Sequence, residues 1–230
     1  MEDNIVLTMR GICMTFPGVK ALENVDFTLR KGEIHALMGE NGAGKSTLMK
    51  CLTGINDFEA GEIHVDGVEG AVKNHSTQDA QNVGISTVYQ EVNLCPNLSV
   101  AENLFIGREP MTPFHTIDRK AMIRKADELV KRLDIKVDVT QNLENYSLAI
   151  QQMIAIARAS DMDCKVLILD EPTSSLDDSE VEKLFKVMRQ LKSEGVGIVF
   201  VTHFLEQVYA LCDRITVLRN GTLVGEYPIA

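Results

Sequence analysis

A glycine-rich stretch constrains this chain more than any other part of its sequence. The stretch GENGAGKST matches the pattern G-x-x-x-x-G-K-[ST]; it follows the apolar run EIHALM and opens the helical-looking segment STLMKCLTG. Glycine tolerates positive φ angles and has no Cβ, so backbone N–H groups can converge on an anion, and the helix that follows adds partial positive charge. The stretch therefore predicts a phosphate-binding loop. Its expected contact residues are Gly39, Glu40, Asn41, Gly42, Ala43, Gly44, Lys45, Ser46 and Thr47.

Two side chains of this loop have specific expected roles. Lys45 is expected to reach the β- and γ-phosphates of a bound triphosphate, and Ser46 to hold Mg²⁺ through its hydroxyl. The alternative is a glycine-rich turn between a strand and a helix, with a solvated lysine. Because the flanking segments also match the context that the motif requires, the phosphate-binding interpretation is favoured.

The run VLILDE at 166–171 is the expected companion of the loop. A buried strand of this length would deliver Asp170 to the metal edge of the phosphate site, where its carboxylate could hold Mg²⁺ or a metal-bound water. Glu171 would then face an attacking water as a general base. Taken alone, an apolar run followed by two acids is a plain strand end, and only its pairing with the Lys45 loop predicts catalysis.

The overall composition is that of an ordinary globular protein. The chain has 230 residues, 45% hydrophobic and 24% charged, enough for one large domain or a core with a small subdomain. Its net charge of −10 argues against nucleic acid as a main partner. No run approaches the roughly 18 apolar residues of a membrane span, and the first ten residues lack the layout of a signal peptide. The five scattered cysteines indicate reduced thiols of a cytosolic protein.

The order of apolar patterns predicts an α/β fold. Alternating apolar residues at 5–9 and 25–29, the more continuous apolar segment at 33–39, the short segment at 62–67 with its Asp-Gly turn, and the segment at 85–90 indicate strands. From Ser99, an expected helix N-cap, the pattern becomes helical through 119–133 and from 150. Strands then return and alternate with helices to the end, the first of these helices being expected at 179–193. We therefore expect a core formed by 1–94 and 161–230, with an inserted helical subdomain at 95–160.

Five more short sequence motifs occur along the chain. They are Phe16 in TFPGVKAL, Gln90 in VYQE, the segment Ser147 to Gln151, Asp177 in SSLD, and His203 in FVTHF. Together with the loop and the VLILDE strand, they make essentially the whole chain resemble the ATP-binding cassettes of ABC transporters. The resemblance implies a P-loop NTPase core of the RecA-like type, with an antiparallel β subdomain and an inserted α-helical subdomain, that binds and hydrolyses ATP with Mg²⁺.

The resemblance also implies a role for each of these motifs. Phe16 would lie under adenine, Gln90 would sense Mg²⁺ and water, and His203 would hydrogen-bond the γ-phosphate. Ser147, Gln151 and Asp177 would lie at the interface with a second cassette. Simpler interpretations stay open: Phe16 as a core aromatic, Gln90 as a solvated strand end, Asp177 as a helix cap and His203 as a surface histidine.

The segment YSLAIQQM departs from the family pattern Leu-Ser-Gly-Gly-Gln. Ser147 and Gln151 remain, but Leu148, Ala149 and Ile150 occupy positions where the family places glycine or a close backbone approach. Two interpretations of this segment remain: a surface that weakly contacts the ATP of a second cassette, and a plain helix start capped by Ser147. We expect both to be partly true. The degenerate segment predicts that the isolated domain binds Mg-ATP but hydrolyses it slowly.

The resemblance is strongest to the ATPase subunits of simple-sugar importers, whose polypeptide often carries two cassettes. FPGVKAL, VYQEVNL, NLSVAENLFIGREP and FVTHFLEQVY bring the chain close to the first cassette of bacterial galactofuranose importers. This implies a peripheral location on the cytoplasmic face of the membrane, permease partners, a second cassette and, indirectly, a periplasmic sugar-binding protein.

A groove around Gln90 and Glu91 would receive a helix of the permease. Leu94, Leu98, Leu104 and Phe105 either line this groove or pack the helical insert. The alternative functions are a soluble ABC-type ATPase acting in DNA repair or translation, and a nucleotide-dependent regulatory module that is not coupled to transport.

Overall fold

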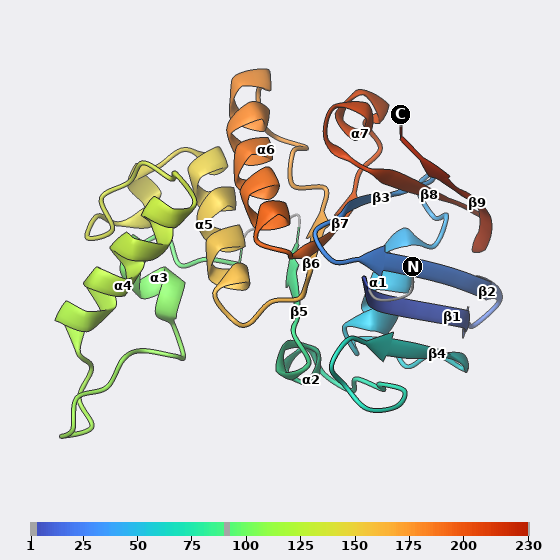
Figure 1. Ribbon diagram of the computed structural model, residues 1–230, viewed down its shortest axis with the longest axis horizontal. Coiled ribbons are helices and arrows are strands. Elements are labelled where there is room, and N and C mark those ends of the chain that lie inside the picture. The colour runs from blue at the N-terminus through green and yellow to red at the C-terminus, as the bar shows by residue number, and fades with distance from the viewer. Residues whose placement is uncertain (1–3, 90–92, 230) are drawn as a thin grey trace.

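Two β-sheets and two groups of helices form the molecule in the computed structural model, which describes residues 4–89 and 93–229. The smaller sheet is antiparallel, in the order β2-β1-β4 (Figure 1). Its strands are β1 (Ile5–Phe16), β2 (Val19–Arg30) and β4 (Ala60–Val65). Met9 and Phe27 face each other across β1 and β2 and are both buried, as the alternating pattern predicts.

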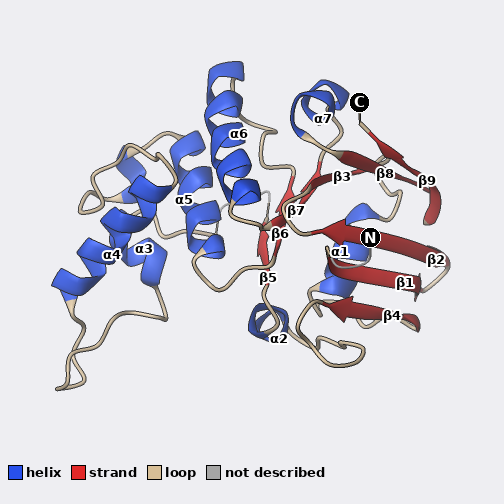
Figure 2. Cartoon of the chain, viewed as in Figure 1, coloured by secondary structure: helices blue, strands red, loops and turns tan. Residues whose placement is uncertain are grey.

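The larger sheet has the order β5-β6-β7-β3-β8-β9, and only β9 runs antiparallel to its neighbour (Figure 2). Its strands are β3 (Ile34–Met38), β5 (Ile85–Val88), β6 (Val166–Asp170), β7 (Gly197–Val201), β8 (Arg214–Arg219) and β9 (Thr222–Pro228). Because β3, β6 and β7 are parallel neighbours, their carboxyl ends meet at one edge of the sheet. The glycine-rich loop, Glu171 and His203 follow these three strands in the chain.

Helices cover both faces of the larger sheet. They are α1 (Lys45–Leu52), α2 (Thr77–Asn82), α3 (Val100–Phe105), α4 (Arg119–Arg132), the short 3₁₀ turn η1 (Leu143–Asn145), α5 (Leu148–Ser160), α6 (Asp178–Ser193) and α7 (Leu205–Leu211). Helix α1 lies between the two sheets, while α3, α4 and α5 gather beyond α6 (Figure 1). The predicted helix at 119–133 and the one at 179–193 are confirmed within one residue.

Each face of the larger sheet belongs to a separate hydrophobic core. Leu167 and Leu169 of β6 pack with α5 and α6, and Val166 and Ile168 of the same strand pack with α1 and the smaller sheet. This alternation explains the continuous apolar run of β6, since both of its faces are covered. Leu104 and Phe105 are buried in the helical core, and Leu94 packs against it. These side chains therefore pack the helical subdomain, as one of the two interpretations expected.

Among the described residues, no helix combines the length and the apolar character needed to cross a membrane.

A buried charged network joins the two sheets, and no local pattern predicted it. Arg214 at the start of β8 forms ion pairs with Glu33 and Glu226, and its Nη2 donates to the Thr28 carbonyl of β2 at 2.9 Å. The same Nη2 lies 3.3 Å from Nδ1 of His35, whose Nε2 is 2.8 Å from the Thr216 hydroxyl. Since the guanidinium can only donate, Nδ1 accepts and Nε2 carries the hydrogen.

This arrangement makes His35 an acid-sensitive part of the fold. Burial, and then the charge of Arg214, lower the pKa of His35 to about 4. Because the pKa in the unfolded chain is about 6.5, the neutral imidazole stabilises the fold above pH 6.5, and this contribution is lost as the pH falls toward 4. We expect the free energy of unfolding to drop by about 3 kcal/mol over this window from His35 alone.

The measurement is urea denaturation at a series of pH values, for the wild type and for His35→Gln, whose amide can still donate and accept. The variant is expected to lose most of the pH dependence between 6.5 and 4. His64→Gln, at an exposed position, is the matched control and should keep it. An identical slope for the wild type and His35→Gln would contradict the assignment.

Candidate nucleotide-binding site

The predicted phosphate-binding loop connects β3 to α1, and two of its glycines, Gly39 and Gly44, are required by close packing. A Cβ on Gly39 would lie 2.4 Å from the carbonyl oxygen of Leu218 in β8. Gly44 has φ of +105° and caps α1, and a Cβ there would lie 2.8 Å from the Ala21 carbonyl oxygen. The loop is thus held against β8 on one side and against β2 on the other, and Ser46, in the first turn of α1, is exposed.

Lys45 lies inside the loop. Its side chain is 6% exposed, and its Nζ donates to the carbonyl oxygens of Gly39 at 2.7 Å and Glu40 at 3.2 Å. An ammonium group has three donors, so one remains available for an anion in the loop. The sequence predicted Lys45 as a phosphate ligand, and its placement at the first turn of α1 agrees with that role.

A cavity of about 420 Å³ opens over this loop. Its lining includes Phe16 at the end of β1, Glu171 after β6, and Asn220 in the turn between β8 and β9. Phe16 is 39% exposed, so it is not the core aromatic of the alternative interpretation. The loop residues in the lining are Asn41, Gly42, Ala43, Gly44, Lys45, Ser46 and Thr47, and the β2 residues are Val19, Lys20 and Ala21.

Asn220 and the three β2 residues were missed by sequence reasoning. Asn220 has φ of +50° and belongs to an Asn-Gly turn, which signals a hairpin but not a ligand. Val19 to Ala21 follow Phe16 along the chain, and only the fold of β1 onto β2 carries them to the cavity. Nothing local to either segment indicates a binding role.

Glu171 is held in an unusual backbone conformation at the end of β6. Its φ is +48°, and its N–H donates to the Val201 carbonyl of β7 at 3.0 Å. Such a left-handed conformation is rare for a residue with a side chain and is concentrated at functional sites. Its carboxylate lies 3.3 Å from Nδ1 of His203, so the structure brings together two of the predicted catalytic residues.

Asp170 precedes Glu171 and is half-buried. Burial, and then the neighbouring charge of Glu171, raise the pKa of Asp170, while Lys45 and Lys50 oppose the shift. A carboxylate that is desolvated and repelled by a second carboxylate is stabilised by a cation beside it. Carboxylate and hydroxyl oxygens are the hard ligands that Mg²⁺ prefers, so Asp170 and the exposed hydroxyl of Ser46 fit such an ion.

The predicted interface residues lie away from this cavity, and none of them lines it. Asp177 caps α6 through its side chain and forms a capping box with Glu180, which confirms the capping interpretation. Ser147 occupies the N-cap position of α5, but its side chain makes no capping hydrogen bond, so the predicted cap is only positional. Gln151 donates to the Tyr146 carbonyl at 3.0 Å. Gln90 lies outside the described residues.

The side chains at the substituted positions of the YSLAIQQM segment differ in how exposed they are. Leu148 is 42% exposed, whereas Ala149 is buried against the helical core and Ile150 is half-buried. The added bulk on the surface therefore comes mainly from Leu148, next to the unused hydroxyl of Ser147.

Comparison with known proteins adds the family. The family model described as ABC transporter matches residues 22–174, more than half of the chain. The galactofuranose transporter ATP-binding protein YtfR of Escherichia coli strain K12 is 58% identical over 96% of this chain and 43% of its own length. The fructose import ATP-binding protein FruK of Bifidobacterium longum is 52% identical over 98% of the chain and 44% of its own length. The chain thus spans less than half of these curated relatives.

Solved structures agree on the fold. The crystal structure of the ADP conformation of MJ1267, an ATP-binding cassette of an ABC transporter, superposes with a TM-score of 0.86 at 23% identity, covering 97% of this chain and 91% of that one. The structure of cbiO1 from Clostridium perfringens, part of the ABC transporter complex cbiONQ, gives 0.84 at 26% identity over 98% and 89% of the two chains. The predicted fold class and the resemblance are both confirmed, and the chain belongs to the ABC transporter family, with the fold of its ATP-binding cassettes.

Proposed function

We propose that this chain is the ATP-binding and ATP-hydrolysing cassette of an importer of simple sugars. The observation that carries the proposal is the cavity that joins the phosphate loop, the aromatic ring of Phe16 and the carboxylate of Glu171. These are the parts needed to hold a base, to neutralise phosphates and to activate water. The relatives are a galactofuranose transporter ATP-binding protein, a fructose import ATP-binding protein and, in Streptomyces coelicolor at 50% identity, a ribose import ATP-binding protein. We propose a simple sugar as the class of solute, and galactofuranose as the first to test.

In the bound state, the loop amides and Lys45 hold the phosphates, and Phe16 stacks on adenine. Ser46 and Asp170 are the residues that would hold Mg²⁺, together with Gln90. When bound, that ion supplies charge neutralisation to the phosphate oxygens. The loop backbone is already folded around Lys45, so the phosphate contacts require little rearrangement.

For hydrolysis, Glu171 accepts a proton from the attacking water and His203 hydrogen-bonds the terminal phosphate. Their contact at 3.3 Å places Nδ1 of His203 against the carboxylate, and the half-exposed ring can turn toward a phosphate without unpacking the core. The backbone hydrogen bond to β7 fixes the point from which the Glu171 side chain starts at the end of β6.

A second cassette, in the same polypeptide or in a dimer, completes the transporter in this proposal. Ser147, Gln151 and Asp177 would contact it, and the free hydroxyl of Ser147 is available for that purpose. Because Leu148 projects at this surface, the site built there is weak, and the isolated chain hydrolyses ATP slowly. The length of the relatives, more than twice the aligned part, supports a further segment.

The remaining assignments follow from the same proposal. Residues 1–94 and 161–230 form the nucleotide-binding core, and 95–160 form the helical subdomain that contains the Ser147 segment. The chain acts at the cytoplasmic face of the membrane as a peripheral subunit. Its partners are permease subunits and, indirectly, a periplasmic sugar-binding protein.

The isolated chain is expected to bind Mg-ATP through Lys45. Lys45→Ala removes the buried ammonium that faces the phosphates, so Mg-ATP affinity should fall by about 100-fold or more, since charge-assisted bonds to phosphate are strong. Equilibrium dialysis with labelled ATP measures the affinity. Lys186→Ala, at an exposed position of α6, is the control and should bind within about threefold of the wild type. If Lys45→Ala bound Mg-ATP as tightly as the control variant and the wild type, the proposed nucleotide site would be wrong.

A further inference from the structure

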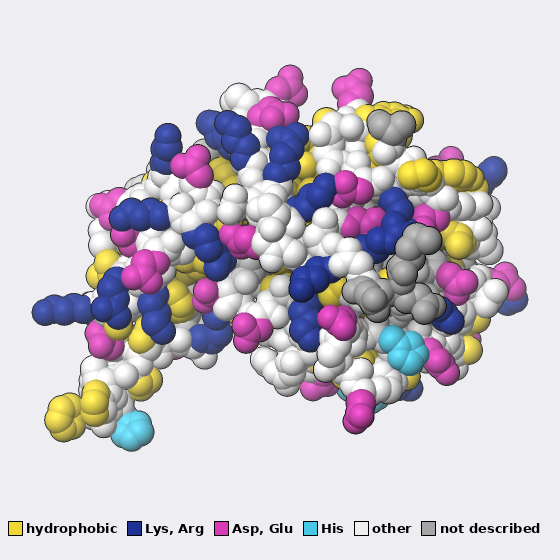
Figure 3. Space-filling model, in the orientation of Figure 1, with side chains coloured by type: hydrophobic (Ala, Val, Ile, Leu, Met, Phe, Trp, Pro, Cys, Tyr) yellow, Lys and Arg dark blue, Asp and Glu magenta, His cyan; other side chains and the backbone are white. Residues whose placement is uncertain are grey.

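A hairpin at residues 109–118 projects from the helical subdomain, between α3 and α4 in the chain (Figure 1). Three of its large apolar side chains are exposed: Phe114 is 87% exposed, Met111 55% and Ile117 50%. Figure 3 shows hydrophobic surface at the end of this projection. No other large apolar side chain in the described part of the chain is as exposed as Phe114. Clustered apolar side chains on a surface mark sites of interaction with proteins, ligands or membranes.

Hydrogen bonds close the hairpin, so its apolar tip has a defined shape. The N–H of Thr112 donates to the Thr116 carbonyl at 2.8 Å, and the two hydroxyls of these threonines lie 2.8 Å apart. The N–H of His115 donates to the Thr112 carbonyl at 3.0 Å, which closes a β-turn with Pro113 and Phe114 at its two central positions. Because the turn is already formed, little ordering is needed when Phe114 meets a binding surface.

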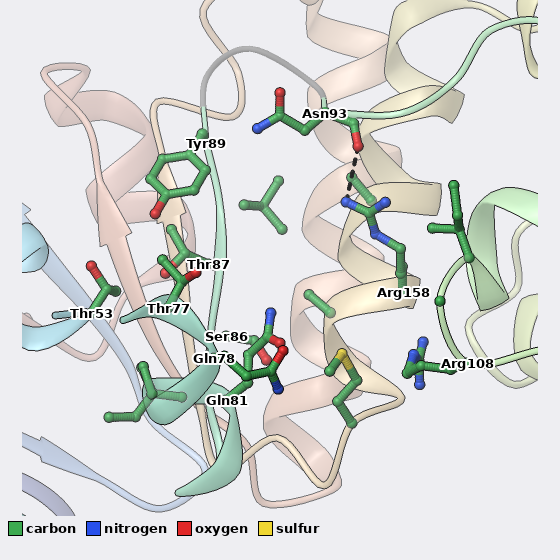
Figure 4. A pocket seen from close by; sticks show the side chains of 18 residues that line it. Thr53, Thr77, Gln78, Gln81, Ser86, Thr87, Tyr89, Asn93, Arg108 and Arg158 are labelled. Atoms are coloured by element: carbon green, nitrogen blue, oxygen red, sulfur yellow. Dashed lines mark hydrogen bonds between the residues drawn. The ribbon is translucent and has the colours of Figure 1, made fainter. Parts of the chain in front are cut away.

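The base of the hairpin is tied to the helices beside it. Nη2 of Arg108 donates to the Leu104 carbonyl of α3 at 2.8 Å, and its Nη1 pairs with Asp161, at the end of α5, at 3.3 Å. Figure 4 shows Arg108 at the rim of a cavity between α2, β5 and α5. On the returning side, the N–H of Asp118 donates to the Pro110 carbonyl at 2.7 Å. The hairpin is thus a firm extension of the helical subdomain.

Helix α4, which follows the hairpin directly, is basic. It has six Lys and Arg but only two Asp and Glu in 14 residues, in a chain whose net charge is −10. Figure 3 shows Lys and Arg side chains over α4, next to the apolar tip. Lys120 and Arg124, one turn apart on the same side of the helix, are exposed and form no ion pair within residues 4–89 and 93–229. The basic residues of the last turn of α4 are paired.

A projecting apolar tip beside unpaired positive charge has the chemistry of a contact with an anionic lipid surface. Aromatic and apolar side chains enter the headgroup region, while Lys and Arg remain at the lipid phosphates. No Asp, Glu, Lys or Arg occurs between Glu109 and Asp118, so the tip itself has no such charge to desolvate. The net negative charge of the chain does not prevent this contact, because charges beyond a Debye length of about 8 Å are largely screened at physiological salt.

We propose that the hairpin enters the headgroup region of an anionic membrane with Phe114 at its tip, while Lys120 and Arg124 bind lipid phosphates. In the proposed function, permease subunits hold the chain at the membrane, and the inference adds a direct contact with lipid. Vesicle binding can be measured without a permease and without a nucleotide, and Mg-ATP affinity without vesicles. The inference and the proposed function can therefore fail separately.

The first test places a fluorescent reporter at the tip. The chain contains no tryptophan, so Phe114→Trp introduces a single one. Vesicles of phosphatidylcholine with one quarter phosphatidylglycerol should shift its emission to shorter wavelength, and brominated acyl chains should quench it. Tyr209→Trp, at an exposed position of α7, is the matched control and should keep the emission of a water-exposed indole. Vesicles of phosphatidylcholine alone should give a much smaller shift, because the lipid charge is absent.

The second test separates the apolar and the charged contributions by co-sedimentation with the same vesicles. Phe114→Ala should weaken vesicle binding by about 10-fold or more, because the buried phenyl ring is lost. Lys120→Gln with Arg124→Gln should weaken it by a similar factor, about fivefold for each charge, and should reduce its salt dependence. The controls are Tyr209→Ala for the ring and Lys183→Gln with Lys186→Gln on α6 for the charges. Mg-ATP affinity should be unchanged in every variant.

Four results would overturn the inference. One is a wild-type chain that does not bind the anionic vesicles, and a second is equal binding to vesicles with and without phosphatidylglycerol. A third is binding that survives Phe114→Ala and is lost only with the two charges, since the tip would then not insert. The last is an indole at position 114 that stays water-exposed on vesicles but is buried when detergent-solubilised permease is added, since the tip would then contact protein. Each of these results, with normal Mg-ATP affinity, would leave the proposed function standing.

Discussion

Glu171→Gln is expected to lower ATP turnover by about 10²- to 10⁴-fold while leaving Mg-ATP affinity within a few fold of the wild type. The amide has nearly the shape of the carboxylate, so the backbone bond to Val201 and the left-handed conformation at this position are retained. The amide cannot accept a proton from water at neutral pH, so the substitution would remove the proposed general base. Phosphate release under multiple-turnover conditions measures the rate.

The comparison should be made in the full-length protein with its partners, where turnover is high enough for a large loss to be quantified. Glu182→Gln, on the exposed side of α6, changes charge equally and should turn over ATP normally. If Glu171→Gln hydrolysed ATP at the wild-type rate, the base would have to be another group. If it failed to bind Mg-ATP, the carboxylate would be a ligand and not a base.

Arg214→Leu is expected to lower the free energy of unfolding by about 3–5 kcal/mol. The substitution leaves the carboxylate of Glu33, which is 5% exposed, without its counter-charge, and removes the donor that reaches Thr28 of the smaller sheet. A buried charge that loses its partner cannot recover hydration without local unfolding. Guanidinium denaturation followed by circular dichroism measures the loss.

Arg189→Leu provides the matched control, because its side chain is 46% exposed and its ion pair with Glu182 is a surface contact at 3.8 Å. It should change stability by less than about 1 kcal/mol. Pairing Arg214→Leu with Glu33→Gln should recover part of the lost stability, since the uncompensated charge is then removed. A loss below about 1 kcal/mol for Arg214→Leu alone would show that the network contributes little.

The phosphate loop could be predicted from sequence because its function depends on a contiguous piece of backbone. Glycines that avoid contacts with Leu218 and Ala21, and a lysine that reaches back to the carbonyl of Gly39, lie within a few positions of one another. The same holds for α4 and α6, whose apolar stripes and capping residues are local. Strand β6 was recognisable because both of its faces are buried, which makes every residue from Val166 to Leu169 apolar.

Other features depended on packing. The apolar residues Leu104 and Phe105 could serve a groove or a core by sequence, and only the position of α3 against α4 and α5 assigns them to the core. Ser147 is of the residue type that sequence rules prefer at a helix N-cap, yet its hydroxyl makes no capping bond. Side-chain orientation at a helix start is decided by small differences in energy that residue type alone does not contain.

By itself, the sequence determined the family and the glycine-rich loop, and it predicted Glu171 and His203 as site residues, because each is encoded in a short motif. The tertiary structure decided which of these residues share a cavity, and it alone produced the network of Arg214 and Glu33, which are 181 positions apart. The physical reason is the distance along the sequence over which each feature depends on other residues. Backbone conformation follows from neighbouring residues, whereas burial, desolvation and counter-charges depend on segments that meet only when the chain is folded.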